Sequence, residues 1–116
     1  MTKRDARVTL AQMLAHAEEA CAMLEGRTRR DLDAHRMLVL AATRLLEIVG
    51  EAATRVPDAD RLRLPAVPWR EIIGLRNRLI HGYDSVDLDI LWATLTIDVP
   101  ALVEVLRRDA RRAGES

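Results

Sequence analysis

The apolar residues of this chain recur at steps of three and four positions along four separate segments, and this spacing restricts the fold more than any other feature. In the first segment the steps run through Leu10, Leu14, Ala17, Cys21 and Leu24. Residues at this spacing share one face of an α-helix, whereas the buried residues of a half-exposed strand alternate every second position. No segment of the sequence shows such alternation. The spacing therefore predicts an all-α fold.

Turn and capping residues divide the chain into four predicted helices. Gly26 suits the C-terminal cap of the first helix, and Thr28 suits the N-cap of the second. Pro68 fits the first turn of the third helix, which Gly82 can end. The helices are expected at about residues 5–25, 29–55, 68–82 and 86–111. Residues 56–67 contain two prolines and are expected to form a linker with room for one extra turn.

A proline lies inside the fourth predicted helix. Pro100 cannot donate a backbone hydrogen bond and should kink the helix around it. Asp84, Ser85 and Asp87 are candidates for the N-cap of this helix. With 116 residues, the chain is long enough for one core but not for two. We expect a single domain over residues 1–116, an up-and-down bundle of four helices with a kinked last helix.

Composition and charge exclude several classes of protein. Cys21 is the only cysteine, so neither a disulfide framework nor a cysteine metal site is expected. The net charge is zero and gives no overall field that would attract nucleic acid. The longest apolar run, residues 37–42, is too short to span a membrane, and the N-terminus lacks the apolar core of a signal peptide. A cytoplasmic protein that needs no cofactor and contacts no membrane is expected.

The second predicted helix is apolar on more than one side. A small bundle cannot bury all of these side chains, which suggests a self-complementary face and a homodimer. The alternative is a monomer with scattered exposed apolar residues. The residues concerned are Ala34, Met37, Val39, Leu40 and Ala42.

The stretch RNRLIHGY, residues 76–83, gathers an unusual share of the polar chemistry, namely Arg76, Asn77, Arg78, His81 and Tyr83. Histidine carries protons near neutral pH, and arginine can hold the negative charge that develops on phosphorus. These residue types fit cleavage of an RNA phosphodiester without a metal, with the asparagine in support. The alternative is structural: a histidine that caps the end of a helix and arginines in surface ion pairs.

Helical geometry complicates a joint role for the arginine and the histidine. Arg76 and His81 are five residues apart, which separates them by about 140° around an ideal helix. They can converge if Gly82 lets the last turn unwind. Otherwise residues from elsewhere, including a second subunit, must complete the site.

The sequence of residues 68–108 resembles the C-terminal half of the HepT-like HEPN proteins, small prokaryotic toxins encoded beside a minimal nucleotidyltransferase antitoxin. The family motif is Arg, a polar residue, three further residues, His, any residue and Tyr. It corresponds here to Arg76, Asn77, residues 78–80, His81, Gly82 and Tyr83. The segment LLEIVGEAA, residues 45–53, also resembles the family.

The resemblance implies a homodimeric, metal-independent endoribonuclease whose two motifs meet in a cleft between the subunits. It implies that Arg76 and His81 are catalytic and that Asn77 supports them. Arg78 matches the common pattern and is a candidate phosphate contact. The expected reaction is attack of a ribose 2′-hydroxyl on its own phosphate.

Tyr83 has a different role by the same resemblance. In the family this tyrosine accepts AMP from ATP, transferred by the partner nucleotidyltransferase. An attached adenylate would bring bulk and negative charge beside a phosphate-binding cleft and repel RNA. The resemblance therefore implies that modification of Tyr83 neutralises the toxin.

Two other functions remain open from the sequence. A HEPN-type bundle could bind RNA, a nucleotide or its partner without catalysis. Glu47 and Glu51, four residues apart on one helix, could instead hold Mg²⁺ in a nucleotide hydrolase. Ion pairs of these glutamates with Arg44 and Arg55 are the favoured interpretation. The two tryptophans, at residues 69 and 92, are expected to pack in the core rather than to stack on bases.

Overall fold

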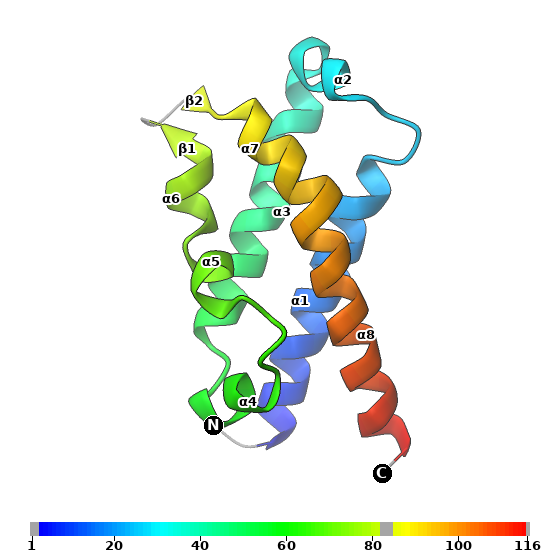
Figure 1. The fold of residues 1–116 in the computed structure, drawn as a ribbon, viewed down its shortest axis with the longest axis vertical. Coiled ribbons are helices and arrows are strands. Elements are labelled where there is room, and N and C mark those ends of the chain that lie inside the picture. The colour runs from blue at the N-terminus through cyan, green and yellow to red at the C-terminus, as the bar shows by residue number, and fades with distance from the viewer. Residues whose placement is uncertain (1–2, 82–84, 116) are drawn as a thin grey trace.

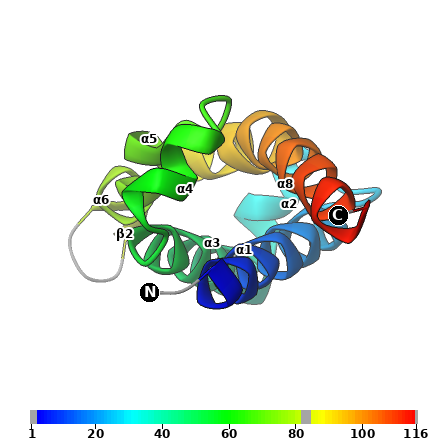
Figure 2. The ribbon, with the colours of Figure 1, turned by 90° about the horizontal axis from the view of Figure 1, so that it is seen from below.

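The computed structural model describes residues 3–81 and 85–115 and shows an elongated bundle of helices (Figures 1 and 2). The prediction of an α-helical fold is confirmed, whereas the expected count of four uninterrupted helices is not. The elements in chain order are α1 Lys3–Met23, α2 Arg29–Ala34, α3 Arg36–Thr54, α4 Asp58–Arg63, α5 Trp69–Ile73, α6 Leu75–Leu79, β1 Ile80–His81, β2 Ser85–Val86, α7 Leu88–Ala93, the π-helical turn η1 Thr94–Asp98, and α8 Val99–Glu115.

The chain runs up and down the bundle four times. It rises through α1, descends through α3, rises through α5 and α6, and descends through α7 and α8 (Figure 1). The α1 helix packs against both α3 and α8. Its predicted apolar stripe is buried at Leu10, Ala17 and Leu24. The centre of the core consists of side chains without solvent exposure, including Met13, Leu46, Leu79 and Leu91.

The first two helix boundaries follow the local signals. The turn after α1 contains Gly26 with φ of 73°, in the left-handed region that its predicted capping role requires. The α2 helix begins after Thr28, whose backbone N–H donates to the Asp31 carboxylate at 2.6 Å. This is one half of a capping box, which supplies an acceptor for a backbone donor at the helix start.

The second predicted helix is divided in two. His35 leaves the helical region, with φ of −125° and ψ of 88°, and separates α2 from α3. Leu32 on α2 is buried, and Arg29 on the same helix forms an ion pair with Asp89 on α7. These tertiary contacts hold α2 against α7. The expectation of a single helix at residues 29–55 is therefore wrong, because packing divides the segment into two helices. The end of α3 at Thr54 agrees with the expected stop before Pro57.

The third predicted helix is also shorter than expected and broken. Gly74 separates α5 from α6, and α6 ends at Leu79 instead of at residue 82. The chain then becomes extended at Ile80 and forms a two-stranded antiparallel hairpin, in which Ile80 faces Val86 and His81 faces Ser85. The backbone N–H of Asp87 donates to the carbonyl of Leu79 at 2.8 Å, which closes the hairpin at its base. Gly82, the predicted helix stop, and Asp84 lie outside the described residues.

The predicted linker contains the short helix α4, which agrees with the room left for an extra turn. Trp69 fixes this segment because its indole N–H donates to the carbonyls of Arg61 and Leu64, each at 3.1 Å. The guanidinium of Arg61 lies 6.0 Å from the centroid of the indole ring. The packing role predicted for Trp69 is confirmed, and the half-buried Trp92 also packs against the core.

The fourth predicted helix begins at Leu88 instead of at about residue 86, because Val86 belongs to β2, and its winding changes before the proline. The Val99 N–H donates to the Thr94 carbonyl, five residues back, which defines the π-helical turn η1. Pro100 has no N–H to offer the preceding turn, and a π-helical turn is one way to absorb this defect. The perturbation expected from Pro100 thus takes the form of a wider turn, and α8 continues to Glu115. Asp87 is the N-cap of α7, and its carboxylate accepts from the N–H groups of Asp89 and Ile90.

Candidate active site

The polar stretch at residues 76–81 passes from a helix into a strand. Arg76, Asn77 and Arg78 are exposed on α6, which is anchored by the buried Leu75 and Leu79. This short helix buries the first and last of its residues and presents the three polar ones between them to solvent.

The change from helix to strand alters the relation between the two predicted catalytic residues. Because α6 ends at Leu79, His81 belongs to β1, and the angle of an ideal helix no longer separates it from Arg76. The helix therefore ends before the histidine, and the extended backbone begins at Ile80 rather than at Gly82. Tyr83 lies outside the described residues.

Arg76 forms an ion pair with a residue from another helix. Its Nε lies 3.5 Å from Oε2 of Glu47 on α3. The Glu47 side chain is mostly buried, at 23% exposure, whereas the Arg76 side chain is 72% exposed. The expected pairing of Glu47 with Arg44 on its own helix is therefore wrong, while the pairing of Glu51 with Arg55, at 3.5 Å, is confirmed.

A cleft of about 480 Å³ lies between α3 and the α5–α6 segment. Both Arg76 and Asn77 line it, so the structure brings these two predicted site residues to one cavity; Arg78 is exposed but is not among the lining residues. The opposite wall belongs to α3 and includes Arg44 and Glu47. The half-buried Ile48 of α3 and Ile73 of α5 also line the cleft.

The α3 wall contains a cation that motif analysis did not select. Arg44 is exposed, lines the cleft, and has no ion-pair partner within the described residues, because Glu47 is directed to Arg76. The only local signal was the i, i+3 spacing of Arg44 and Glu47, which predicted an ion pair between them and not an unpaired arginine. The role of Arg44 in the cleft depends on how α6 packs against α3, and the spacing along α3 carries no information about that.

The acidic residues of the cleft are held in ion pairs with arginines. Glu47 contacts Arg76, and Glu51 contacts Arg55. Among the residues that the structure describes, no group of three histidine, cysteine, aspartate or glutamate side chains could bind a metal ion. The donor set for the Mg²⁺ alternative is therefore limited to two carboxylates that already contact guanidinium groups.

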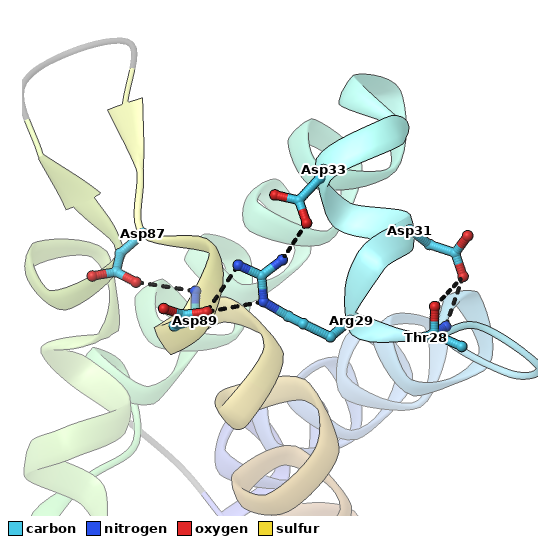
Figure 3. A network of polar contacts seen from close by, with 6 residues as sticks. All are labelled: Thr28, Arg29, Asp31, Asp33, Asp87 and Asp89. Atoms are coloured by element: carbon cyan, nitrogen blue, oxygen red, sulfur yellow. Dashed lines mark hydrogen bonds and ion pairs between the residues drawn. The ribbon is translucent and has the colours of Figure 1, made fainter.

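A polar network fixes the C-terminal side of the hairpin (Figure 3). Arg29 of α2 contacts Asp89 of α7 through Nε at 3.0 Å and Nη2 at 2.8 Å, and Asp33 through Nη1 at 3.0 Å. The hydrogen bond with Asp89 raises the pKa of Arg29 above its usual value. These contacts join α2 to the first turn of α7, directly after β2. The hairpin that carries His81 therefore lies between α6 and α7, and side-chain contacts with α2 hold the first turn of α7 in place.

The same network contains the N-terminal cap of α2. The hydrogen bond from the Thr28 backbone N–H lowers the pKa of Asp31 below its usual value, and the Thr28 hydroxyl, 3.4 Å away, has the same effect. His35 Nε2 lies 3.9 Å from the Asp31 carboxylate. The ionised form of Asp31 is therefore stabilised by the start of its own helix.

The surface beside the site has exposed apolar side chains on α3. Met37 is 85% exposed and Leu40 is 50% exposed, while Val39 and Ala42 belong to the core. Two of the five residues of the predicted apolar face are therefore buried within the chain and are not part of the exposed surface. Leu40 also lines a second cleft, of about 590 Å³, whose other wall includes Ser85, Val86 and Leu88. The exposed apolar residues therefore extend toward the hairpin that carries the polar motif.

Comparison with known proteins gives consistent matches over most of the chain. The family model described as ribonuclease HepT-like matches residues 13–108. "Putative RNase MJ1380" of Methanocaldococcus jannaschii is 35% identical over 102 residues, which cover 88% of this chain and 94% of that protein. "Probable ribonuclease HepT" of Thermococcus cleftensis is 38% identical over 88 residues, 72% of this chain and 80% of that protein. No solved structure matches the chain. Within the described part of the chain, every helix is too short or too polar to cross a membrane.

Proposed function

Because the chain belongs to the HepT-like family of ribonucleases, we propose that it is a metal-independent endoribonuclease that uses the motif at residues 76–83. The observation that carries the proposal is the position of Arg76 and Asn77 on one cleft, at the point where α6 leads into the strand that contains His81. The names of the relatives describe ribonucleases, which supports RNA as the substrate.

The proposed reaction is an internal transesterification. The ribose 2′-oxygen attacks the adjacent phosphorus and loses its proton, the bond from phosphorus to the 5′-oxygen breaks, and that oxygen gains a proton. The products are a 2′,3′-cyclic phosphate and a 5′-hydroxyl. His81 moves the proton, since imidazole titrates near neutral pH. Arg76 holds the charge on the phosphate oxygens, and Asn77 supports them by hydrogen bonding.

The ion pair with Glu47 is compatible with this role of Arg76. The guanidinium has several N–H donors, and the ion pair joins its Nε to the Glu47 carboxylate at 3.5 Å. The other N–H groups of the guanidinium can bind a phosphate while Glu47 stays in contact with Nε. Arg78, exposed on the same short helix, is the candidate for a further phosphate contact.

We also propose that the active protein is a homodimer with both motifs near the subunit interface. Met37 and Leu40 are exposed on α3, and the face they form continues to the hairpin through the second cleft. Burial of this face between two copies would remove apolar surface from water and bring two copies of the motif close together.

Cleavage of a labelled RNA by the full chain in the presence of a chelator tests the catalytic proposal. We expect cleavage to continue with EDTA and to fall at least about a hundredfold in His81→Ala and in Arg76→Ala. Arg70→Ala, which removes an exposed arginine on α5 away from the cleft lining, is the matched control and should cleave normally.

The two alternatives predict different results in the same assay. RNA binding without cleavage by the unmodified chain would favour a non-catalytic binding module. Activity that EDTA abolishes, and that Glu51→Gln also removes, would favour the Mg²⁺-dependent nucleotide hydrolase. Either result would overturn the ribonuclease proposal.

The finer proposal concerns regulation. The chain acts as the toxin of a toxin–antitoxin pair, and a partner nucleotidyltransferase neutralises it by transfer of AMP to Tyr83. This proposal rests on the motif, in which the tyrosine follows the histidine by two residues. Intact mass of the chain after incubation with the nucleotidyltransferase and ATP should rise in adenylate steps, and Tyr83→Phe should show no such rise. In cells, Tyr83→Phe should still arrest growth but resist neutralisation, whereas an unchanged mass of the wild-type chain would contradict the proposal.

A further inference from the structure

The cleft between α3 and α5–α6 has two walls, and only one of them carries the motif. Arg76 and Asn77 come from α6, whereas the α3 wall contributes Arg44 and Glu47. Its volume, about 480 Å³, is in the range of pockets that hold small organic ligands, which leaves room for part of a nucleotide. What the α3 wall does in this cavity is not explained by the motif.

Arg44 differs from the other arginine on the same cleft. Arg76 is joined to Glu47, but Arg44 has no carboxylate within ion-pair distance in the described part of the chain. Glu51, the other carboxylate of the α3 wall, contacts Arg55. Arg44 is thus an exposed cation beside a cavity whose two carboxylates are both in contact with other guanidinium groups.

A cation in this position is suited to an anion that enters the cleft. Arginine presents a planar set of donors that matches phosphate oxygens, and its charge is fixed at every physiological pH. Glu47 lies one helical turn beyond Arg44 and is mostly buried, so it holds the guanidinium of Arg76 on the same cavity. The two arginines therefore face one cavity from opposite walls.

We propose that Arg44 is a substrate-binding residue, and that the cleft between α3 and α6 is a subsite in which Arg44 binds a phosphate of the RNA. This inference rests on the proposed ribonuclease function and adds a residue outside the motif. Glu47 is a positioning residue, which acts through Arg76. The subsite draws on α3, so the RNA is held by two helices that are distant in sequence.

Binding of a short labelled single-stranded RNA, measured at several salt concentrations, tests this inference. The full chain carries His81→Ala so that the RNA stays intact, and Arg44→Ala and Arg44→Lys are added to that background. We expect Arg44→Ala to weaken binding about tenfold at moderate salt, because a charge-assisted hydrogen bond is lost. It should also reduce the slope of log affinity against log salt by about 0.7, as expected for one phosphate contact on a single strand. Arg44→Lys should retain most of the slope.

Arg111→Ala is the matched control, since it removes an exposed arginine of α8 that does not line the cleft. Equal binding by Arg44→Ala and Arg111→Ala, with normal cleavage by the unmodified chain, would overturn the role of Arg44 alone. Absence of both cleavage by the unmodified chain and RNA binding by His81→Ala would overturn the proposed function and the subsite together. Sedimentation of each variant is measured in parallel, and weaker binding that only follows a change in oligomeric state would also overturn the inference.

Discussion

Gly50 determines how closely the motif-bearing segment approaches α3. A Cβ atom at this position would lie 2.9 Å from the carbonyl oxygen of Ile72 on α5. Because the obstacle is backbone, no side-chain rotation can relieve the contact. Gly50 also lines the cleft, so the absence of a side chain here sets the distance between its two walls.

We expect Gly50→Ala to lower the free energy of unfolding by about 1–3 kcal/mol, because the added methyl group forces α5 away from α3. Chemical denaturation followed by circular dichroism measures this change. Gly114→Ala is the control, since a Cβ there meets nothing within 4 Å and should leave stability nearly unchanged. Equal stability of Gly50→Ala and the unmodified chain would show that α5 can move at little cost.

At the scale of elements, short helices are set by contacts at their ends. The α2 helix has only six residues and depends on the capping interaction between Thr28 and Asp31 and on the ion pair from Arg29 to α7. An isolated helix of this length would not be stable in water. The stability of α2 should therefore depend on the ionisation of Asp31, which accepts the hydrogen bond from Thr28.

The lowered pKa of Asp31 gives a specific dependence on pH. The folded chain favours the ionised form of Asp31. Its contribution to the free energy of unfolding is therefore fully present above the unfolded pKa, about 3.9, and is lost as the pH falls through the lower folded pKa. We expect Asp31→Asn to be less stable than the unmodified chain at pH 7. Urea denaturation of both proteins should show that the difference shrinks below about pH 4. A difference that stays constant down to pH 3 would contradict this role of Asp31.

At the scale of the whole molecule, the proposed homodimer would bring two copies of the motif together. The exposed Met37 and Leu40 are central to the proposed interface, while another exposed apolar residue, Leu62, lies on α4. Figure 1 shows α4 at the opposite end of the bundle from the hairpin. The two regions therefore offer a matched comparison.

We expect the unmodified chain to sediment as a dimer and Met37→Glu to weaken dimerisation about tenfold or more, because a carboxylate would be buried without a partner. Analytical ultracentrifugation over a range of concentrations measures the dissociation constant. Leu62→Glu introduces the same charge on α4 and should leave dimerisation unchanged. A monomer for the unmodified chain, or equal effects of both substitutions, would contradict the proposed interface.

The sequence by itself determined the features that depend on neighbours along the chain. Apolar spacing of three and four residues fixed the helical class, and Gly26, Thr28 and the residues before Pro57 marked helix ends close to those observed. The motif at residues 76–83 could also be identified from the sequence, because its residue types and spacing are local. Each of these signals acts within one or two helical turns.

Only the tertiary structure decided the features that depend on residues far apart in the chain. The break at His35 follows from contacts of α2 with α7, and the end of α6 at Leu79 accompanies strand pairing with residues 85–86. The partner of Glu47 was predicted to be Arg44, three residues away, but is Arg76, which packing of α6 on α3 brings to 3.5 Å. Local spacing favours one partner weakly, by a few tenths of a kcal/mol for an ion pair on a helix. Burial of the core outweighs such a preference, and so the packing of helices decided which charges meet in the cleft and left Arg44 facing it.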